Sequence, residues 1–238
     1  MYVLVACEES QRVCISFREK GFEAYSCDIL ECSGGHPEWH IQGDVTDIIN
    51  PLAHDGHHPD IRFTTMDGVS HIIDKWDLII AHPPCTHLCS AGQHLFSRGL
   101  KDLDLREEAI IFFMHFVFAN CEHIAIENPI GIMSTRYQKP DQIIQPYEYG
   151  HPETKRTCLW LKGLPKLVPT NVVEKPKGGW INQCIDQNGH YGGFATKDEN
   201  GKWLRYNDPK TSVLRSKTYW GIARAMADQW GDYLKGRK

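Results

Sequence analysis

The sequence lacks any apolar run close to the roughly 18 residues that a membrane-spanning helix needs. Its N-terminus is apolar but has neither a basic leader nor a small-residue cleavage site, which argues against a secretion signal. The nine cysteines are scattered and lack the short regular spacings of a disulfide-rich small domain. Internal repeats and low-complexity tracts are absent as well. We therefore expect a soluble, cytoplasmic protein with reduced thiols and no membrane partner.

Basic residues are scarce in the first part of the chain. Residues 1–133 hold 8 Lys and Arg against 20 Asp and Glu, whereas residues 134–238 hold 18 against 10, so the net charge of −4 hides a strong asymmetry. A basic C-terminal part suits the binding of a polyanion such as DNA. The alternative, that both sets of charges simply face solvent, stays open until a basic face is seen.

Length and pattern indicate an α/β protein. The 238 residues suffice for one large domain, or for one domain with a small appendage. Short apolar runs alternate with helix signals over the first 130 residues, which predicts parallel βαβ units. The predicted strands are 2–6, 23–26, 39–42, 77–81 and 123–126, and the predicted helices are 11–20, with Ser10 as its N-cap, and 105–119. Residues 50–75 give no clear prediction.

The pattern changes after Pro129. Segments 143–149 and 157–161 predict a closing hairpin, and segment 221–234 predicts an amphipathic helix. Residues 164–215 are rich in glycine, aromatic and basic residues and show no helical period, so we expect a loop-rich insertion there. The predicted organisation is a core of residues 1–163, an insertion of residues 164–215, and a C-terminal helix in residues 216–238 that packs back on the core.

Two of the predicted strands end in residues that carry chemistry. One stops at Pro83-Pro84 and presents Cys85, and another delivers Glu127-Asn128-Pro129. The carboxyl ends of parallel strands meet at one edge of a sheet, where α/β proteins bind ligands. A thiol and a carboxylate at that edge predict a site for nucleophilic and acid–base chemistry. The structural alternatives are an inert buried cysteine and a glutamate that caps a helix or forms a salt bridge.

These residues belong to a longer series of motifs. The motifs are Leu4 to Gln11, Asp28, Gly43-Asp44-Val45, Pro83-Pro84-Cys85, Glu127-Asn128-Pro129, Tyr149 to Arg156 and Tyr219 to Ala227. Their order and spacing resemble the DNA (cytosine-5) methyltransferases, and more closely a compact phage and prophage branch of that family. The resemblance covers nearly the whole chain, and it implies a Rossmann-like class I methyltransferase fold, mostly parallel, with helices on both faces. It also implies a bacterial or phage-infected cell, and it leaves open whether the protein is a restriction companion or serves phage self-protection.

The resemblance implies methyl transfer to carbon 5 of a cytosine that is flipped out of double-stranded DNA. Cys85 would add to ring carbon 6 and so make carbon 5 nucleophilic. Glu127 would hold a proton at ring nitrogen 3, and Lys155 or Arg156 would place a cation near the exocyclic oxygen. Asn128 would orient the loop that carries Cys85.

The implied methyl donor is S-adenosylmethionine, held across the carboxyl ends of the first strands. Asp28 would accept hydrogen bonds from the ribose and Asp44 from the adenine amino group, although each is alternatively an ordinary turn residue. The family's Phe-x-Gly-x-Gly turn is replaced by a glycine-free segment, in which Ser10 and the helix amides would hold the donor's carboxylate. The residues expected at the donor site are Cys7, Glu8, Ser10, Asp28, Ile29, Asp44, Val45 and Pro83.

Contacts with DNA are expected from two segments. Residues 86–104 are long and polar enough to close over a flipped base. The insertion would read the flanking sequence, and its small size predicts a short or relaxed target, or a partner that supplies specificity. A monomer is the simplest oligomeric state, and the sequence leaves that state open. The residues expected to contact the substrate are Pro84, Thr86, Lys166, Lys177, Lys202 and Arg205.

Cys27, Cys32, His36 and His40 are of metal-ligand type, but their spacing matches no established zinc pattern, so we expect no metal. Two other functions stay open. One is a pyrimidine methyltransferase that acts on RNA or free nucleotides, as a small recognition region suggests. The other is a DNA-binding protein that has lost donor binding, as the missing glycines suggest.

Overall fold

A seven-stranded sheet runs through the middle of the computed structural model, which describes residues 1–49, 60–175, 194–197, 200–201, 203–205 and 208–236. The strand order is β3-β2-β1-β6-β7-β9-β8. The first five strands in this order are parallel, whereas β9 is antiparallel to both of its neighbours. The strands are β1 (Tyr2–Ala6), β2 (Glu23–Asp28), β3 (His40–Gln42), β6 (Leu78–Ala81), β7 (Ile124–Pro129), β8 (Gln142–Ile144) and β9 (Thr157–Lys162).

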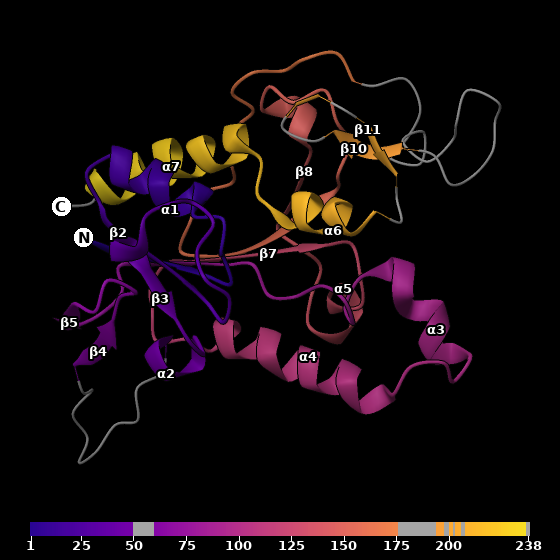
Figure 1. Ribbon diagram of the computed structural model, residues 1–238, viewed down its shortest axis with the longest axis horizontal. Coiled ribbons are helices and arrows are strands. Elements are labelled where there is room, and N and C mark those ends of the chain that lie inside the picture. The colour runs from indigo at the N-terminus through magenta and orange to yellow at the C-terminus, as the bar shows by residue number, and fades with distance from the viewer. Residues whose placement is uncertain (50–59, 176–193, 198–199, 202, 206–207, 237–238) are drawn as a thin grey trace.

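The central strands are apolar because both of their faces are covered. Residues 3–6 of β1 and all of β6 are fully buried, as expected for parallel strands between two layers of helices. One face packs against α1 (Arg12–Glu19) and α7 (Trp220–Lys235), with Phe17 and Trp230 in its core. The other packs against α2 (Thr46–Ile49) and α4 (Leu103–Val117), with Phe113 and Phe116 in its core. Figure 1 shows α1 and α7 on one side of the sheet and α2 and α4 on the other.

The predicted mixed α/β architecture with a mostly parallel sheet and helices on both faces is confirmed, as is the antiparallel pairing of the closing hairpin through β8 and β9. Residues 50–75, which gave no clear prediction, include a small antiparallel hairpin of β4 (Ile61–Thr64) and β5 (Ser70–Ile73). Among the described helices, none combines the length and apolarity needed to cross a membrane.

Three local predictions are wrong. Ser10 is not the N-cap of α1, which begins after Gln11 and has no side-chain cap at that position. The expected open loop of residues 86–104 contains the short helix α3 (Gln93–Ser97), whose Phe96 is buried. The insertion was expected to contain no helix, but α6 (Pro209–Ser216) begins there, after Asp208, whose side chain accepts a hydrogen bond from the backbone N–H of Lys210. The same segment contains a two-stranded sheet of β10 (Phe194–Lys197) and β11 (Trp203–Arg205).

Candidate active site

The carboxyl edge of the parallel strands gathers most of the predicted site residues. The chain order reverses between β1 and β6, and ligands of doubly wound sheets bind at the carboxyl ends beside such a switch point. Cys7 and Glu8 follow β1, Asp28 ends β2, and the Pro83 to Cys85 turn follows β6. Glu127 and Asn128, near the end of β7, complete this edge.

Asn128 fixes the turn that carries Cys85. Its side chain is 1% exposed, and Nδ2 donates a 2.7 Å hydrogen bond to the carbonyl oxygen of Pro83. The backbone N–H of His82 donates to Ala6, which extends the pairing of β6 with β1 up to the double proline. Because Pro83 and Pro84 have no backbone N–H with which to continue the strand pairing, the side-chain donor of Asn128 helps to hold the turn. This hydrogen bond to Pro83 is consistent with the predicted role of Asn128 in orienting the turn.

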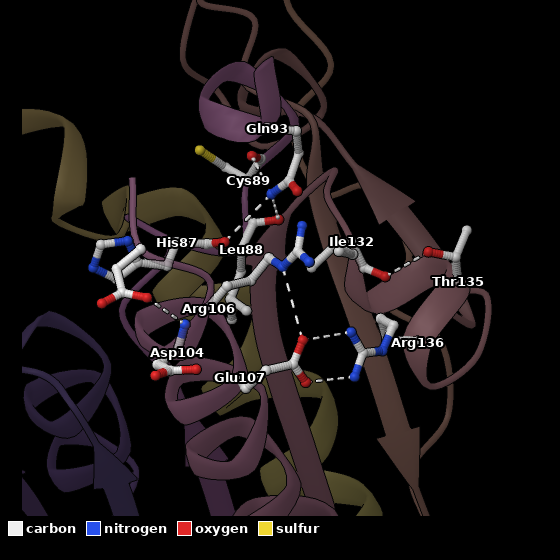
Figure 2. Close-up of polar contacts among 11 residues, drawn as sticks. His87, Leu88, Cys89, Gln93, Asp104, Arg106, Glu107, Ile132, Thr135 and Arg136 are labelled. Carbon is white, nitrogen blue, oxygen red and sulfur yellow. Dashed lines mark hydrogen bonds and ion pairs between the residues drawn. The ribbon is translucent and has the colours of Figure 1, made fainter. Parts of the chain in front are cut away.

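The chain beyond Cys85 is braced as a tight turn. The N–H groups of Leu88 and Cys89 both donate to the carbonyl of Cys85, and Leu88 is fully buried. Figure 2 shows the side-chain amide of Gln93 reaching back to the carbonyls of residues 87–89, at 3.2 to 3.5 Å. Gly131 lies so close to this turn that an added Cβ would fall 2.0 Å from the carbonyl oxygen of Leu88. The base of the predicted closing segment is thus fixed to the core.

An ion-paired cluster joins the elements that follow this turn. Glu107 on α4 forms two hydrogen bonds, of 2.7 and 2.5 Å, with the guanidinium of Arg136 on α5 (Met133–Arg136). Arg106 approaches the same carboxylate at 3.9 Å (Figure 2). The pair is partly exposed, so it adds little to stability, but its bidentate geometry sets how α5 lies against α4.

The sulfur of Cys85 is accessible but lies in a site that disfavours its charged form. Cys85 is the exposed cysteine among those in the described part of the chain. Desolvation by the surrounding loops raises the pKa of its thiol, the charges of Cys89 and Glu127 raise it further, and only the charge of Lys155 among the neighbouring side chains lowers it. The raised pKa favours the protonated thiol, so the predicted nucleophilic role would need a bound substrate or a further cation that favours the thiolate.

Glu127 is held in its ionised form. Burial raises the pKa of this carboxylate, but a hydrogen bond from His82, the charges of Lys155 and His82, and a hydrogen bond from Thr157 outweigh burial and hold the pKa below its ordinary range. The hydrogen bond joins Nδ1 of His82 and Oε2 of Glu127 at 3.4 Å. His82 was not predicted as a site residue, although the sequence places it directly before Pro83-Pro84-Cys85.

Lys155, rather than Arg156, faces the site. Its positive charge lowers the pKa of both Cys85 and Glu127, whereas Arg156 is exposed and affects neither. The backbone N–H of Lys155 donates to Gln145, and its Nζ donates at 2.9 Å to the backbone carbonyl of Arg215. These contacts hold the ammonium group between the core and α6, so Lys155 is the one of the two basic residues whose charge acts on Cys85 and Glu127.

The two C-terminal motifs meet around this lysine. The N–H of Gly221 donates at 2.9 Å to Nε2 of His151, and the hydroxyl of Tyr219 donates to Glu153. A Cβ at Gly221 would fall 1.8 Å from the carbonyl oxygen of Tyr149, so only glycine permits this approach. The start of α7 thereby holds the segment that presents Lys155, a contact that sequence spacing alone does not reveal.

The first turn after β1 is built without glycine. Cys7 and Gln11 both adopt left-handed backbone conformations, with φ of 59° and 57°, where glycine would be the usual choice. Glu8 is 4% exposed, and its carboxylate accepts hydrogen bonds of 2.8 and 3.2 Å from the N–H groups of Val13 and Cys14. Glu8, and not Ser10, therefore caps α1, and the amides expected to hold the donor's carboxylate are already occupied.

The remaining predicted donor residues fall into two groups. Asp28 and Asp44 each accept a hydrogen bond from a backbone N–H two residues on, at 3.0 and 2.9 Å, so both form turns as well as presenting carboxylates at the edge. Ile29 is 74% exposed beside Asp28 and offers an apolar surface. Val45 and Pro83 are buried next to this edge and do not expose their side chains to a ligand.

The predicted substrate contacts are only partly covered by the structure. Pro84, Thr86 and Lys166 are exposed, and the first two lie beside Cys85. Arg205 is at the end of β11, where the structure describes the backbone alone. Lys177 and Lys202 lie outside the described residues.

Both histidines considered as metal ligands have other partners. His40 is buried, and its two ring nitrogens contact Ser26 Oγ at 2.8 Å and the carbonyl of Leu30 at 2.9 Å. His36 contacts Glu38 and stacks on Trp39, and the thiol of Cys27 is buried. Over the described residues, no group of three or more His, Cys, Asp and Glu side chains could hold a metal ion.

The fold and this edge define an α/β protein with a thiol, a carboxylate, a lysine and a histidine beside the switch point of its sheet. No known protein-family model matches the sequence, and no curated protein is similar enough to count as a relative.

Proposed function

We propose that the protein is a DNA cytosine-5 methyltransferase that uses S-adenosylmethionine and forms a covalent adduct through Cys85. The observation that carries the proposal is the convergence of Cys85, Glu127 and Lys155 at one edge of the sheet, where the charges of the last two both act on the thiol. The strand order, with antiparallel β9 between β7 and β8, is also that of class I methyltransferases and supports the proposal.

Each of these groups has a separate task in the proposed reaction. The thiolate of Cys85 attacks ring carbon 6, Lys155 stabilises the negative charge on the thiolate and at the exocyclic oxygen, and Glu127 delivers a proton to ring nitrogen 3. Asn128 holds the turn so that the sulfur approaches the ring in a fixed direction. Carbon 5 becomes enamine-like, and the donor supplies the methyl group. A water molecule or a nearby base then removes the carbon 5 proton, and the thiolate leaves.

The carboxyl edge fits the nucleoside end of the donor better than its amino-acid end. The carboxylates of Asp28 and Asp44 and the exposed side chain of Ile29 suit a ribose and an adenine. The amides at the start of α1 are bonded to Glu8, so the carboxylate of the donor needs another partner.

Methyl incorporation tests the proposal. The protein is incubated with methyl-labelled S-adenosylmethionine and, separately, duplex DNA of mixed sequence, RNA and dCMP. We expect label in duplex DNA, as 5-methylcytosine, and its loss in Cys85→Ala. Label in RNA or dCMP but not in DNA would establish the alternative substrate class instead, and no label in any of the three would contradict the proposal.

A second candidate, a DNA-binding protein without methyl transfer, is favoured by the occupied N-terminus of α1. Calorimetry separates the two candidates. A methyltransferase must bind S-adenosylmethionine, either alone or together with DNA, whereas a DNA-binding protein without methyl transfer need not. DNA binding without donor binding at millimolar concentration would favour the second candidate.

A further inference from the structure

His82 lies between the buried carboxylate of Glu8 and the partly buried carboxylate of Glu127 at the carboxyl edge. It directly follows β6, whose Ala81 pairs with Ile126, so its side chain is next to that of Glu127 on the adjacent strand. Nδ1 of His82 is 3.4 Å from Oε2 of Glu127. On the other side, the charge of His82 reaches Glu8 in the turn after β1 and lowers the pKa of that carboxyl group against the effect of burial.

The imidazole of His82 is enclosed, and within the described residues only one of its two ring nitrogens has a hydrogen-bond partner. The side chain of His82 is 9% exposed and that of Glu127 is 17% exposed. Nε2 of His82 is buried and has no hydrogen-bond partner within the described part of the chain. A buried polar nitrogen without a partner costs stability, and such groups are concentrated at functional sites. Packing alone would be served better by an apolar side chain.

The proposed reaction needs a proton that Glu127 does not hold at rest. The free protein keeps Glu127 ionised, yet ring nitrogen 3 must be protonated as the sulfur adds to carbon 6. The titratable and charged groups around the pair are Glu8, with Glu9 and Arg12 beyond it, and Lys155 and Cys85 on the side of Glu127. Of these neighbours, His82 alone combines a hydrogen bond to Glu127 with a ring that can carry a proton on either of two nitrogens.

We propose that His82 is the proton reservoir for Glu127, a positioning and relay residue of the same site, and this inference rests on the proposed function. The pair starts with the proton on His82 and Glu127 ionised. Cys85 first loses its thiol proton to water. As the sulfur's electron pair forms the bond to carbon 6, the carbon 5–carbon 6 double bond shifts to carbon 4–carbon 5, and the carbon 4–nitrogen 3 double bond becomes a lone pair on nitrogen 3. The proton passes from Nδ1 to Glu127 and on to that lone pair. His82 is then neutral and Glu127 is again ionised. When the thiolate leaves, nitrogen 3 returns the proton by the same route.

The test measures the rate of adduct formation at Cys85 in a single turnover, with duplexes containing 5-fluorocytosine and S-adenosylmethionine. His82→Asn keeps an N–H donor towards Oε2 of Glu127 but cannot release a proton, so we expect adduct formation to slow by about 10²-fold, the lower end for general acid–base catalysis. DNA affinity should change by less than threefold. His123→Asn makes the same substitution at the opposite edge of the sheet, where His123 contacts the carbonyl of Asp77, and should react like wild type.

Chemical rescue separates proton transfer from packing. His82→Ala leaves a cavity that imidazole and pyrazole, which have nearly the same shape, can both fill. Imidazole should restore adduct formation at least tenfold, with a rate that falls as its protonated fraction falls, whereas pyrazole stays neutral and should restore nothing. If His82→Ala does not fold, His82→Asn, checked by thermal unfolding, carries the test through its altered pH–rate profile.

Two results would overturn the inference while leaving the proposed function intact: adduct formation in His82→Asn within twofold of wild type, or equal rescue by imidazole and pyrazole. The absence of both adduct and methyl transfer in the wild-type protein would instead overturn the proposed function, and the role of His82 with it.

Discussion

Replacing Asn128 with Ala should weaken the fold and the reaction together. The substitution removes the donor of the 2.7 Å hydrogen bond to Pro83 and leaves that buried carbonyl without its partner. Leaving a buried acceptor unsatisfied costs about 1 to 3 kcal/mol. The change also removes Oδ1 of Asn128, which is buried and has no hydrogen-bond partner in the described structure, and this offsets part of the cost. We therefore expect a loss of about 1 to 2 kcal/mol in the free energy of unfolding.

The assay is urea denaturation and thermal unfolding of wild type, Asn128→Ala and Asn128→Asp. For a chain of this size, the expected loss corresponds to a decrease in Tm of about 2 to 8 °C. Asn128→Asp has nearly the same shape but places an acceptor against the carbonyl of Pro83, so it should be less stable than the alanine variant at neutral pH. Both variants should form the Cys85 adduct more slowly, because the turn is held less firmly. Wild-type stability and rate in both variants would refute the reasoning.

The other predictions concern charges at the same edge. Because burial raises the pKa of Glu8, its stabilising contribution is greatest at acid pH and declines as pH rises towards the raised pKa; Glu8→Gln should flatten that part of the stability–pH curve. The pKa of Glu127 is lowered, so its stabilisation is present above the ordinary range and lost as pH falls; the stability difference between wild type and Glu127→Gln, from urea unfolding, should shrink towards acid. Lys155→Ala should raise the pKa of Cys85 and slow its alkylation by iodoacetamide several-fold, followed by peptide mapping, whereas Arg156→Ala should not. The assignments of Glu8 and Glu127 would be contradicted if the stability difference between wild type and each variant did not change with pH. The assignment of Lys155 would be contradicted if Lys155→Ala and Arg156→Ala changed the alkylation rate equally.

The parts of the fold that the sequence predicts best are those in which a single strand or helix carries its own signal. The runs at Val3 and Ile79 are apolar because helices cover both faces of the sheet, and this run of apolar residues is what predicts the two strands. The helix α6 is not predicted, although Asp208 and Pro209 form a standard start signal, because the glycine-rich segment around it shows no helical period.

The parts of the site that the sequence does not predict depend on contacts between residues that only the folded chain brings together. Glu8 reaches the amides of Val13 only because the turn adopts two left-handed residues, which no propensity for Cys7 or Gln11 would suggest. The choice of Lys155 over its neighbour depends on its contact with a carbonyl sixty residues away. The partnership of His82 with Glu127 requires the pairing of β6 with β7, which motif spacing does not specify.

The most direct test of the central claim is mass spectrometry of the protein after incubation with S-adenosylmethionine and a duplex library that carries 5-fluorocytosine in all neighbouring sequence contexts. The account predicts a protein–DNA adduct whose crosslinked peptide contains Cys85, and its absence in Cys85→Ser although that variant still binds DNA. A library that yields no adduct, or a crosslink at another residue, would contradict it.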